Sequence, residues 1–229
     1  MDNREHSLAK FEALKIFFEE MGYEPMAGHK NRIFLLAPDN DCGVERLLIL
    51  TRGSSLEFMG VRYALRQEDI EEFAASCMIE LLGADPRDWR KKSREYAALS
   101  FFPLAREGER GASPWGLALR DFSQTRIIAE VASIVSRNIE PAFGLVHTTR
   151  DHFDVLLSDT KEFPWWQSSG TVRLAQIIGL GAKLGMAEYR IRELLAPIHN
   201  QIARDLIGPR DVASFVAEVL VAARKLRPM

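Results

Sequence analysis

Two histidines and a carboxylate lie close together in the sequence, at His147, Asp151 and His152. A histidine that a carboxylate orients is the usual centre of acid–base or nucleophilic catalysis. On a helix, however, residues five apart point about 140° away from each other. The two histidines are therefore wrongly spaced for the paired ligands of a zinc protease, and no third ligand is signalled nearby. If the chain is an enzyme, these three residues are the candidate catalytic residues.

Asp151 also has a sufficient structural role. The four residues from Thr148 to Asp151 have the spacing of a capping box, in which two side chains bond the first free backbone N–H groups of a helix. The sequence therefore predicts a helix that begins at Thr148.

A second candidate site consists of Phe163, Trp165 and Trp166, in a loop that also contains Pro164. Two adjacent tryptophans in such a loop cannot easily both face one core. An exposed tryptophan would anchor another protein well, because tryptophan is enriched where binding energy is concentrated. Alternatively, the loop folds under and fills the gap between the two halves of the chain. We therefore predict a partner-binding site here, with core filling as the alternative.

A third candidate site is the stretch 180–194, which has the spacing of a helix-turn-helix. In that motif a small residue, here Gly181, lets two helices approach, and a glycine, here Gly185, turns the chain. The second helix would then present to a DNA major groove the side chains of Tyr189, Arg190 and Arg192. An ordinary corner between two helices has the same spacing, and Pro197 would bend the second helix.

Composition limits the class of protein. The chain has 229 residues, of which 47% are hydrophobic, enough for a packed core and too many for a disordered protein. Its net charge of −2 provides no overall attraction to nucleic acid or to an anionic membrane. Cys42 and Cys77 lie far apart, which argues against a disulfide scaffold or a zinc site.

Targeting and cofactor signals are also missing from the sequence. Residues 1–6 mix charges and lack an apolar segment, and nowhere do eighteen apolar residues run together. Two glycine-rich stretches, 22–30 and 179–185, miss the spacing of the phosphate loop and of the dinucleotide fingerprint. We therefore predict a cytoplasmic protein that needs no cofactor, no metal and no membrane.

The candidate sites all fall in 115–229, which we predict to be mainly helical. Ser123 can cap a helix that Pro141 should stop. From 171 to 226, three apolar stripes with helical period follow one another and predict a bundle.

The residues before 115 predict an α+β region over 1–105. A first helix is expected from a cap at Ser7 to Gly22, and a second from Gln67 to Gly83, with Cys77 on its buried face. Between them, three apolar runs at 32–37, 44–51 and 56–65 predict an antiparallel meander.

The polar stretch 106–114 is the candidate linker between these two regions. The alternative is a single domain, in which 115–120 pairs back onto 99–104 in a long hairpin.

Together these patterns predict a helix-rich α+β protein with a small antiparallel sheet of three or slightly more strands, flanking helices and a carboxyl-terminal helical bundle. Our first functional hypothesis is a non-catalytic intracellular binding protein, whether adaptor, chaperone-like or regulatory, whose partner is another protein or a second copy of itself. The alternatives are a DNA-binding regulator that uses the corner at Gly185, and an enzyme whose site converges only in three dimensions.

Overall fold

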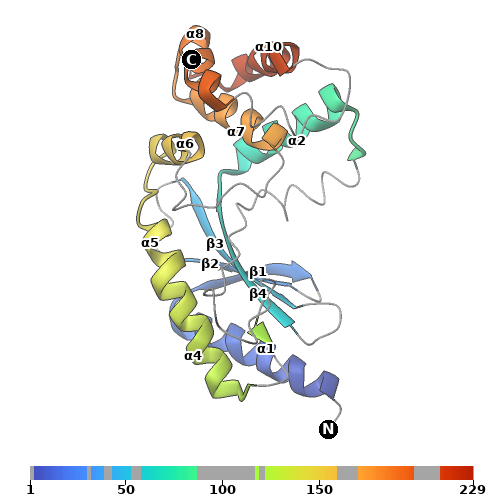
Figure 1. Ribbon diagram of the computed structural model, residues 1–229, viewed down its shortest axis with the longest axis vertical. Coiled ribbons are helices and arrows are strands. Elements are labelled where there is room, and N and C mark those ends of the chain that lie inside the picture. The colour runs from blue at the N-terminus through green and yellow to red at the C-terminus, as the bar shows by residue number, and fades with distance from the viewer. Residues whose placement is uncertain are drawn as a thin grey trace. The chain divides into compact units, whose positions relative to one another are not determined.

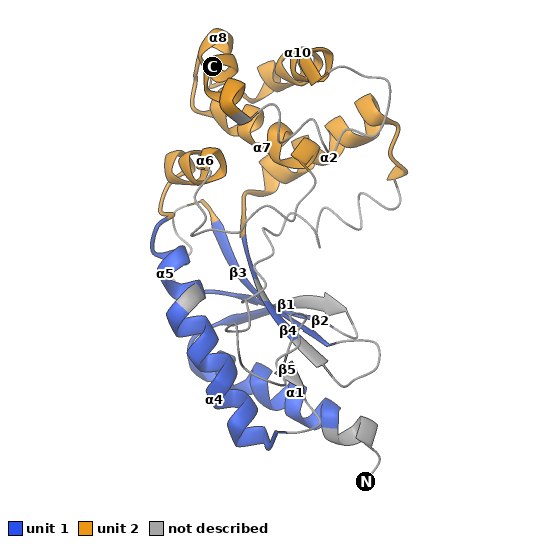
Figure 2. Cartoon of the chain, in the orientation of Figure 1, with its two compact units in different colours: residues 1–41, 45–64, 100–145 blue, residues 42–44, 65–99, 146–229 orange. Residues whose placement is uncertain are grey.

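A computed structural model describes residues 3–29, 32–38, 43–52, 58–86, 117–118, 122–158, 170–198 and 212–228, and the structural statements below concern these residues. They form the helix-rich α+β fold that the sequence predicts, with one antiparallel sheet and flanking helices (Figure 1). The chain divides into two compact units that interleave in sequence (Figure 2). Unit 1 comprises 1–41, 45–64 and 100–145, and unit 2 comprises 42–44, 65–99 and 146–229. The predicted linker at 106–114 lies outside the described residues and stays a prediction.

In the described part of the chain, the sheet has five strands in sequence order: β1 (Glu24–His29), β2 (Arg32–Leu36), β3 (Glu45–Arg52), β4 (Phe58–Arg66) and β5 (Leu117–Ala118). The three predicted runs are present as β2, β3 and β4. The strand β1 was not predicted, because Pro25 and Gly28 are poor strand formers. Pro25 is tolerated there because β1 lies at the edge of the sheet, where fewer backbone donors are needed.

Unit 1 also contains α1 (Asn3–Glu20) and α4 (Gln124–Ile134), which pack against each other. Phe11, Leu14 and Phe18 bury the inner face of α1. Lys10 in α1 donates a hydrogen bond of 2.7 Å to the backbone oxygen of Phe122, just before α4 begins. The predicted cap at Ser7 is wrong, because α1 begins at Asn3 and Ser7 is buried within it. Residues 3–6 contain no proline or glycine, so the helix can begin before Ser7.

The helix that starts with α4 confirms one predicted boundary and corrects another. Ser123 caps α4 by accepting a hydrogen bond of 3.3 Å from the backbone N–H of Arg126. Pro141 does not stop the helix, which continues through a π-helical turn, η1 (Val135–Ile139), into α5 (Glu140–Phe143). Pro141 lies in the first turn of α5, directly after this π turn. Phe143 then packs edge-on against Tyr63 of β4, with ring centroids 5.7 Å apart.

The described residues of unit 2 form the helices α2 (Glu68–Leu82), α6 (Thr149–Leu157), α7 (Gly170–Lys183), α8 (Glu188–Leu195) and α10 (Val212–Ala222). They also form the 3₁₀ turns η2 (Ala196–Ile198) and η3 (Ala223–Leu226). Helix α7 contacts α2, α6, α8, α10 and η3, and every residue from Gly170 to Ala182 is buried. It is therefore the central helix of the unit. At Gly179 a Cβ would lie 2.8 Å from a ring atom of Phe73 in α2, so the glycine permits this close packing.

Several helix boundaries in unit 2 follow the prediction. Gly83 ends α2 in a left-handed conformation with φ 68°. Helix α8 ends at Leu195, and the 3₁₀ turn η2, which contains Pro197, follows it directly. Cys77 is buried on α2, and burial raises the pKa of its thiol to about 12, which makes it a small apolar side chain at neutral pH. No helix among the described residues is long and apolar enough to cross a membrane.

Candidate functional site

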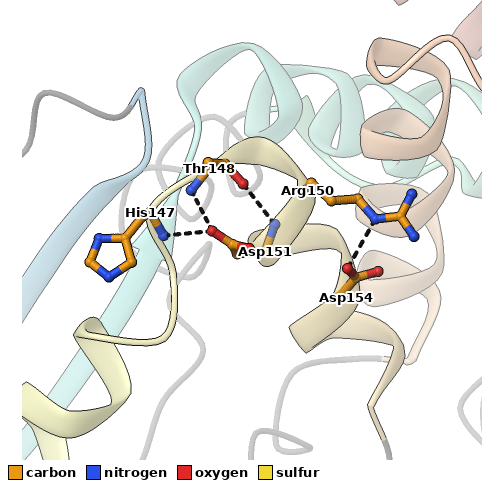
Figure 3. Close-up of polar contacts among 5 residues, drawn as sticks. All are labelled: His147, Thr148, Arg150, Asp151 and Asp154. Carbon is orange, nitrogen blue, oxygen red and sulfur yellow. Dashed lines mark hydrogen bonds and ion pairs between the residues drawn. The ribbon is translucent and has the colours of Figure 1, made fainter.

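The capping box predicted at the start of α6 is present (Figure 3). Oδ2 of Asp151 accepts hydrogen bonds from the backbone N–H groups of His147, at 3.0 Å, and of Thr148, at 2.9 Å. Oγ1 of Thr148 accepts a bond of 3.1 Å from the backbone N–H of Asp151. The bond from His147, followed by those from Thr148, lowers the pKa of the Asp151 carboxyl. The carboxylate thus holds the backbone, and the imidazole of His147 points away from it (Figure 3).

The third member of the predicted cluster, His152, is 1% exposed and makes its contact on the other side of α6. Its Nδ1 lies 3.1 Å from Nε2 of Gln67, the residue that precedes α2. Oε1 of Gln67 accepts hydrogen bonds from Nζ of Lys183, at 3.0 Å, and from Oγ1 of Thr149, at 3.3 Å. Lys183 also forms an ion pair of 2.7 Å with Asp69. Gln67 is therefore the centre of a polar network that joins α2, α6 and α7.

This network decides the protonation of His152. A lysine ammonium can only donate, so the oxygen of the Gln67 amide faces Lys183 and its nitrogen faces the imidazole. The amide nitrogen donates, so Nδ1 of His152 accepts, and the neutral ring carries its proton on Nε2. Among the described residues, Nε2 has no hydrogen-bond partner. Burial, followed by the positive charge of Lys183, lowers the pKa of His152 to about 4, so the ring is neutral at neutral pH.

The three predicted catalytic residues therefore do not share one site. His147 lies exposed before α6, Asp151 caps the helix, and His152 is enclosed with its basic nitrogen already occupied. A general base must reach a proton of its substrate, and His152 has no exposed basic atom. No group of three His, Cys, Asp or Glu side chains in the described ranges is placed to hold a metal ion. These contacts account for the position of α6 and for its link to α2 and α7.

Two further buried polar contacts fix α7 in unit 2. Nε2 of Gln176 donates to both carboxylate oxygens of Glu71 in α2, at 2.9 and 3.1 Å. The guanidinium of Arg173 donates two hydrogen bonds, of 2.9 and 2.7 Å, to the backbone oxygen of Leu156 in α6. A buried polar group destabilises a fold when it loses its hydrogen-bond partner. These hydrogen bonds therefore favour one position of α7 along α2 and α6.

The corner between α7 and α8 depends on two glycines. A Cβ at Gly181 would lie 2.9 Å from Cδ1 and 3.0 Å from Cγ1 of Ile191, so the glycine permits this close approach of α8 to α7. Gly185 adopts φ 70°, a left-handed conformation that favours glycine. Met186 N–H donates to the oxygen of Gly181 at 3.0 Å, and Gly185 N–H donates to that of Ala182 at 2.9 Å. These two bonds form the Schellman motif that ends many helices.

This corner leaves one face of α8 in solvent. Ile191 and Leu195 are buried, whereas Arg190, Arg192 and Tyr189, which is 69% exposed, lie on the outer side. Nη1 of Arg190 forms an ion pair of 2.8 Å with Glu193. Arg192 forms no ion pair with another described residue.

Two arginines from η3 and the residue after it extend this surface. Nε of Arg224 lies 2.9 Å, and Nη2 of Arg227 lies 3.7 Å, from the same oxygen of Glu188 at the start of α8. The hydrogen bond from Arg224 is the main reason why the pKa of Glu188 is lowered. These residues together form a surface that we call the α8 basic surface: Glu188, Tyr189, Arg190, Arg192, Glu193, Arg224 and Arg227. Its four arginines and two glutamates give it a net charge of +2, opposite in sign to the net charge of −2 of the whole chain.

Sequence reasoning missed Gln67, Arg224 and Arg227 as site residues. Gln67 and His152 are 85 residues apart, and no local pattern links them. The arginines had a local explanation as cations at a helix end, which hid their contact with α8. The aromatic residues Phe163, Trp165 and Trp166 lie outside the described residues, so their partner-binding role stays a prediction. No family model, curated protein or solved structure matches the chain.

Proposed function

We propose that the protein is a non-catalytic binding protein that binds duplex DNA through the α8 basic surface, with α8 in the major groove. The observation that carries the proposal is the outward face of α8, where Tyr189, Arg190 and Arg192 stand on a helix held by the glycine corner. A helix of about 10 Å in diameter fits the major groove, which is about 12 Å wide.

The chemistry of the exposed side chains suits that groove. An arginine can donate two parallel hydrogen bonds to O6 and N7 of guanine, the commonest specific contact in the major groove. Arg192, without an ion pair among the described residues, is the side chain best placed to make it. Arg190 would have to exchange its bond with Glu193 for a bond to DNA. The corner between α7 and α8 supports this function because it already holds α8 in place. Little conformational entropy would then be lost when α8 binds DNA.

The test measures binding of the protein to a labelled DNA duplex of about two helical turns. Fluorescence anisotropy gives the affinity at salt concentrations from about 50 mM to about 200 mM. We expect the affinity to fall as salt rises, because phosphate contacts release counterions. The Arg190→Ala and Arg192→Ala variants should each weaken binding, and the double variant should abolish it.

Arg150→Ala is the matched control. Arg150 is as exposed as Arg190, 56% in both cases, and forms a similar ion pair of 2.9 Å, with Asp154 on α6. Its loss should leave DNA binding unchanged. The proposal is refuted if the wild-type protein fails to bind duplex DNA at the lowest salt, or if Arg150→Ala weakens binding as much as Arg190→Ala does.

A further inference from the structure

Glu188, at the start of α8, forms ion pairs with two arginines that lie 36 and 39 residues further along the chain. Arg224 and Arg227 approach the same oxygen, Oε1, at 2.9 and 3.7 Å. One carboxylate leaves an excess charge of +1 at this point. The side chains of Arg224 and Arg227 are also 60% and 39% exposed, so both guanidinium groups face solvent while they hold Glu188.

The backbone that carries these arginines is held in place by packing. Ala223, at the start of η3, is buried, and η3 contacts α7. Further along, Cγ of Pro228 lies 3.7 Å from the point where a Cβ would stand at Gly185. The segment 223–228 therefore runs beside the turn between α7 and α8. Its arginines are fixed next to the first turn of α8.

We propose that Arg224 and Arg227 form a phosphate-binding site beside α8, and that Glu188 occupies this site when no phosphate is bound. Two guanidinium groups that converge on one anionic oxygen match a phosphate oxygen as well as a carboxylate oxygen. The inference rests on the proposed function, because the phosphate meant here belongs to the backbone of the DNA whose groove α8 enters. Such a contact orients the protein on the duplex and reads no sequence.

Glu188 then has two effects on binding. In the free protein it keeps Arg224 and Arg227 together at the start of α8. On DNA its negative charge lies next to the phosphate and opposes binding, since like charges at short range repel. A side chain of the same shape without the charge should therefore leave the site in place and strengthen the phosphate contact.

The experiment compares four proteins by the slope of log affinity against log salt, on two duplexes of unrelated sequence. Each phosphate that a protein neutralises contributes about 0.9 to that slope. The Arg224→Ala/Arg227→Ala variant should have a slope shallower by about 0.9 and should lose affinity by the same factor on both duplexes. Glu188→Gln should bind both duplexes more tightly than the wild-type protein.

Lys225→Ala is the matched control, since it removes a positive charge from the same segment. Nζ of Lys225 lies 5.9 Å from the centre of the Phe73 ring in α2, so this side chain is directed elsewhere. Its slope should equal that of the wild-type protein. Circular dichroism of every variant checks that the helices are intact.

The outcomes distinguish the two proposals. If the wild-type protein binds no duplex, the proposed function fails and this inference fails with it. If the wild-type protein binds and Arg190→Ala weakens it, but the Arg224/Arg227 variant keeps the wild-type slope, only the inference is overturned. The inference is also overturned if Glu188→Gln weakens binding. It is overturned too if Lys225→Ala makes the salt dependence as much shallower as the Arg224→Ala/Arg227→Ala variant does.

Discussion

We predict that acid destabilises unit 2 through protonation of His152 in α6. The imidazole is 1% exposed, accepts a hydrogen bond from Gln67 and lies near the positive charge of Lys183, whose own partner is Asp69. Protonation would bury a second positive charge beside Lys183. It would also remove the acceptor that the Gln67 amide uses. We therefore expect the helices that meet at Gln67 to lose stability when the ring is protonated.

The pKa of His152 determines the pH range. Burial and Lys183 lower it from 6.5 to about 4 in the folded protein, so the unfolded chain binds the proton more tightly. The stability that the neutral ring provides is thus complete above pH 6.5 and is lost as the pH falls toward 4. A pKa difference of one is worth about 1.4 kcal/mol, which makes the full loss about 3 kcal/mol, with about 2 kcal/mol of it between pH 7 and pH 5.

The assay is urea denaturation followed by circular dichroism at pH 7 and pH 5, for the wild-type protein and for His152→Gln. The variant cannot take up the proton, so the wild-type protein should lose about 2 kcal/mol more than the variant over this range. His147→Gln, a change at the exposed histidine before α6, is the control and should behave as the wild-type protein does. Equal losses in the wild-type protein and His152→Gln would refute the view that His152 is buried in its neutral form.

Three further predictions concern packing, reactivity and capping. Gly181→Ala should destabilise the protein by about 1–3 kcal/mol in urea denaturation, because the new Cβ would lie 2.9 Å from Cδ1 of Ile191, and adding Ile191→Val should recover part of the loss. An unchanged midpoint in Gly181→Ala would contradict the close approach of α7 and α8. In a Cys42→Ser background, the buried thiol of Cys77 should react with a disulfide reagent only after denaturant is added, and immediate reaction of the native protein would show that it is accessible. Thr148→Ala should cost about 1 kcal/mol by removing the cap of α6, and a melting temperature equal to that of the wild-type protein would argue against that cap.

Local features of this protein were predictable from its sequence. The apolar spacing located α2, α7 and α10, and three of the five strands. The capping box at Thr148 and the left-handed glycines at Gly83 and Gly185 were also visible, because each of them involves bonds between residues only a few positions apart. The same holds for the corner at Gly185, whose Schellman bonds span at most five residues.

Two helix boundaries were predicted wrongly because neighbouring residues had a stronger effect than the predicted cap or stop. The cap expected at Ser7 failed because helix-compatible residues precede it, and the stop expected at Pro141 failed because a π-helical turn accommodates the proline. The strand β1 had no signal of its own. It exists because β2 offers it a partner for hydrogen bonding.

The tertiary structure alone decided which distant residues meet. Nothing in the sequence links Gln67 to His152, or Glu188 to Arg224, because these pairs lie 85 and 36 residues apart. Hydrogen bonds and charges act over a few ångströms, so such contacts depend on how whole helices pack and not on spacing along the chain. The sequence determined the helices and their apolar faces, and the packing around α7 determined that His152 is enclosed while the arginines beside α8 converge on Glu188.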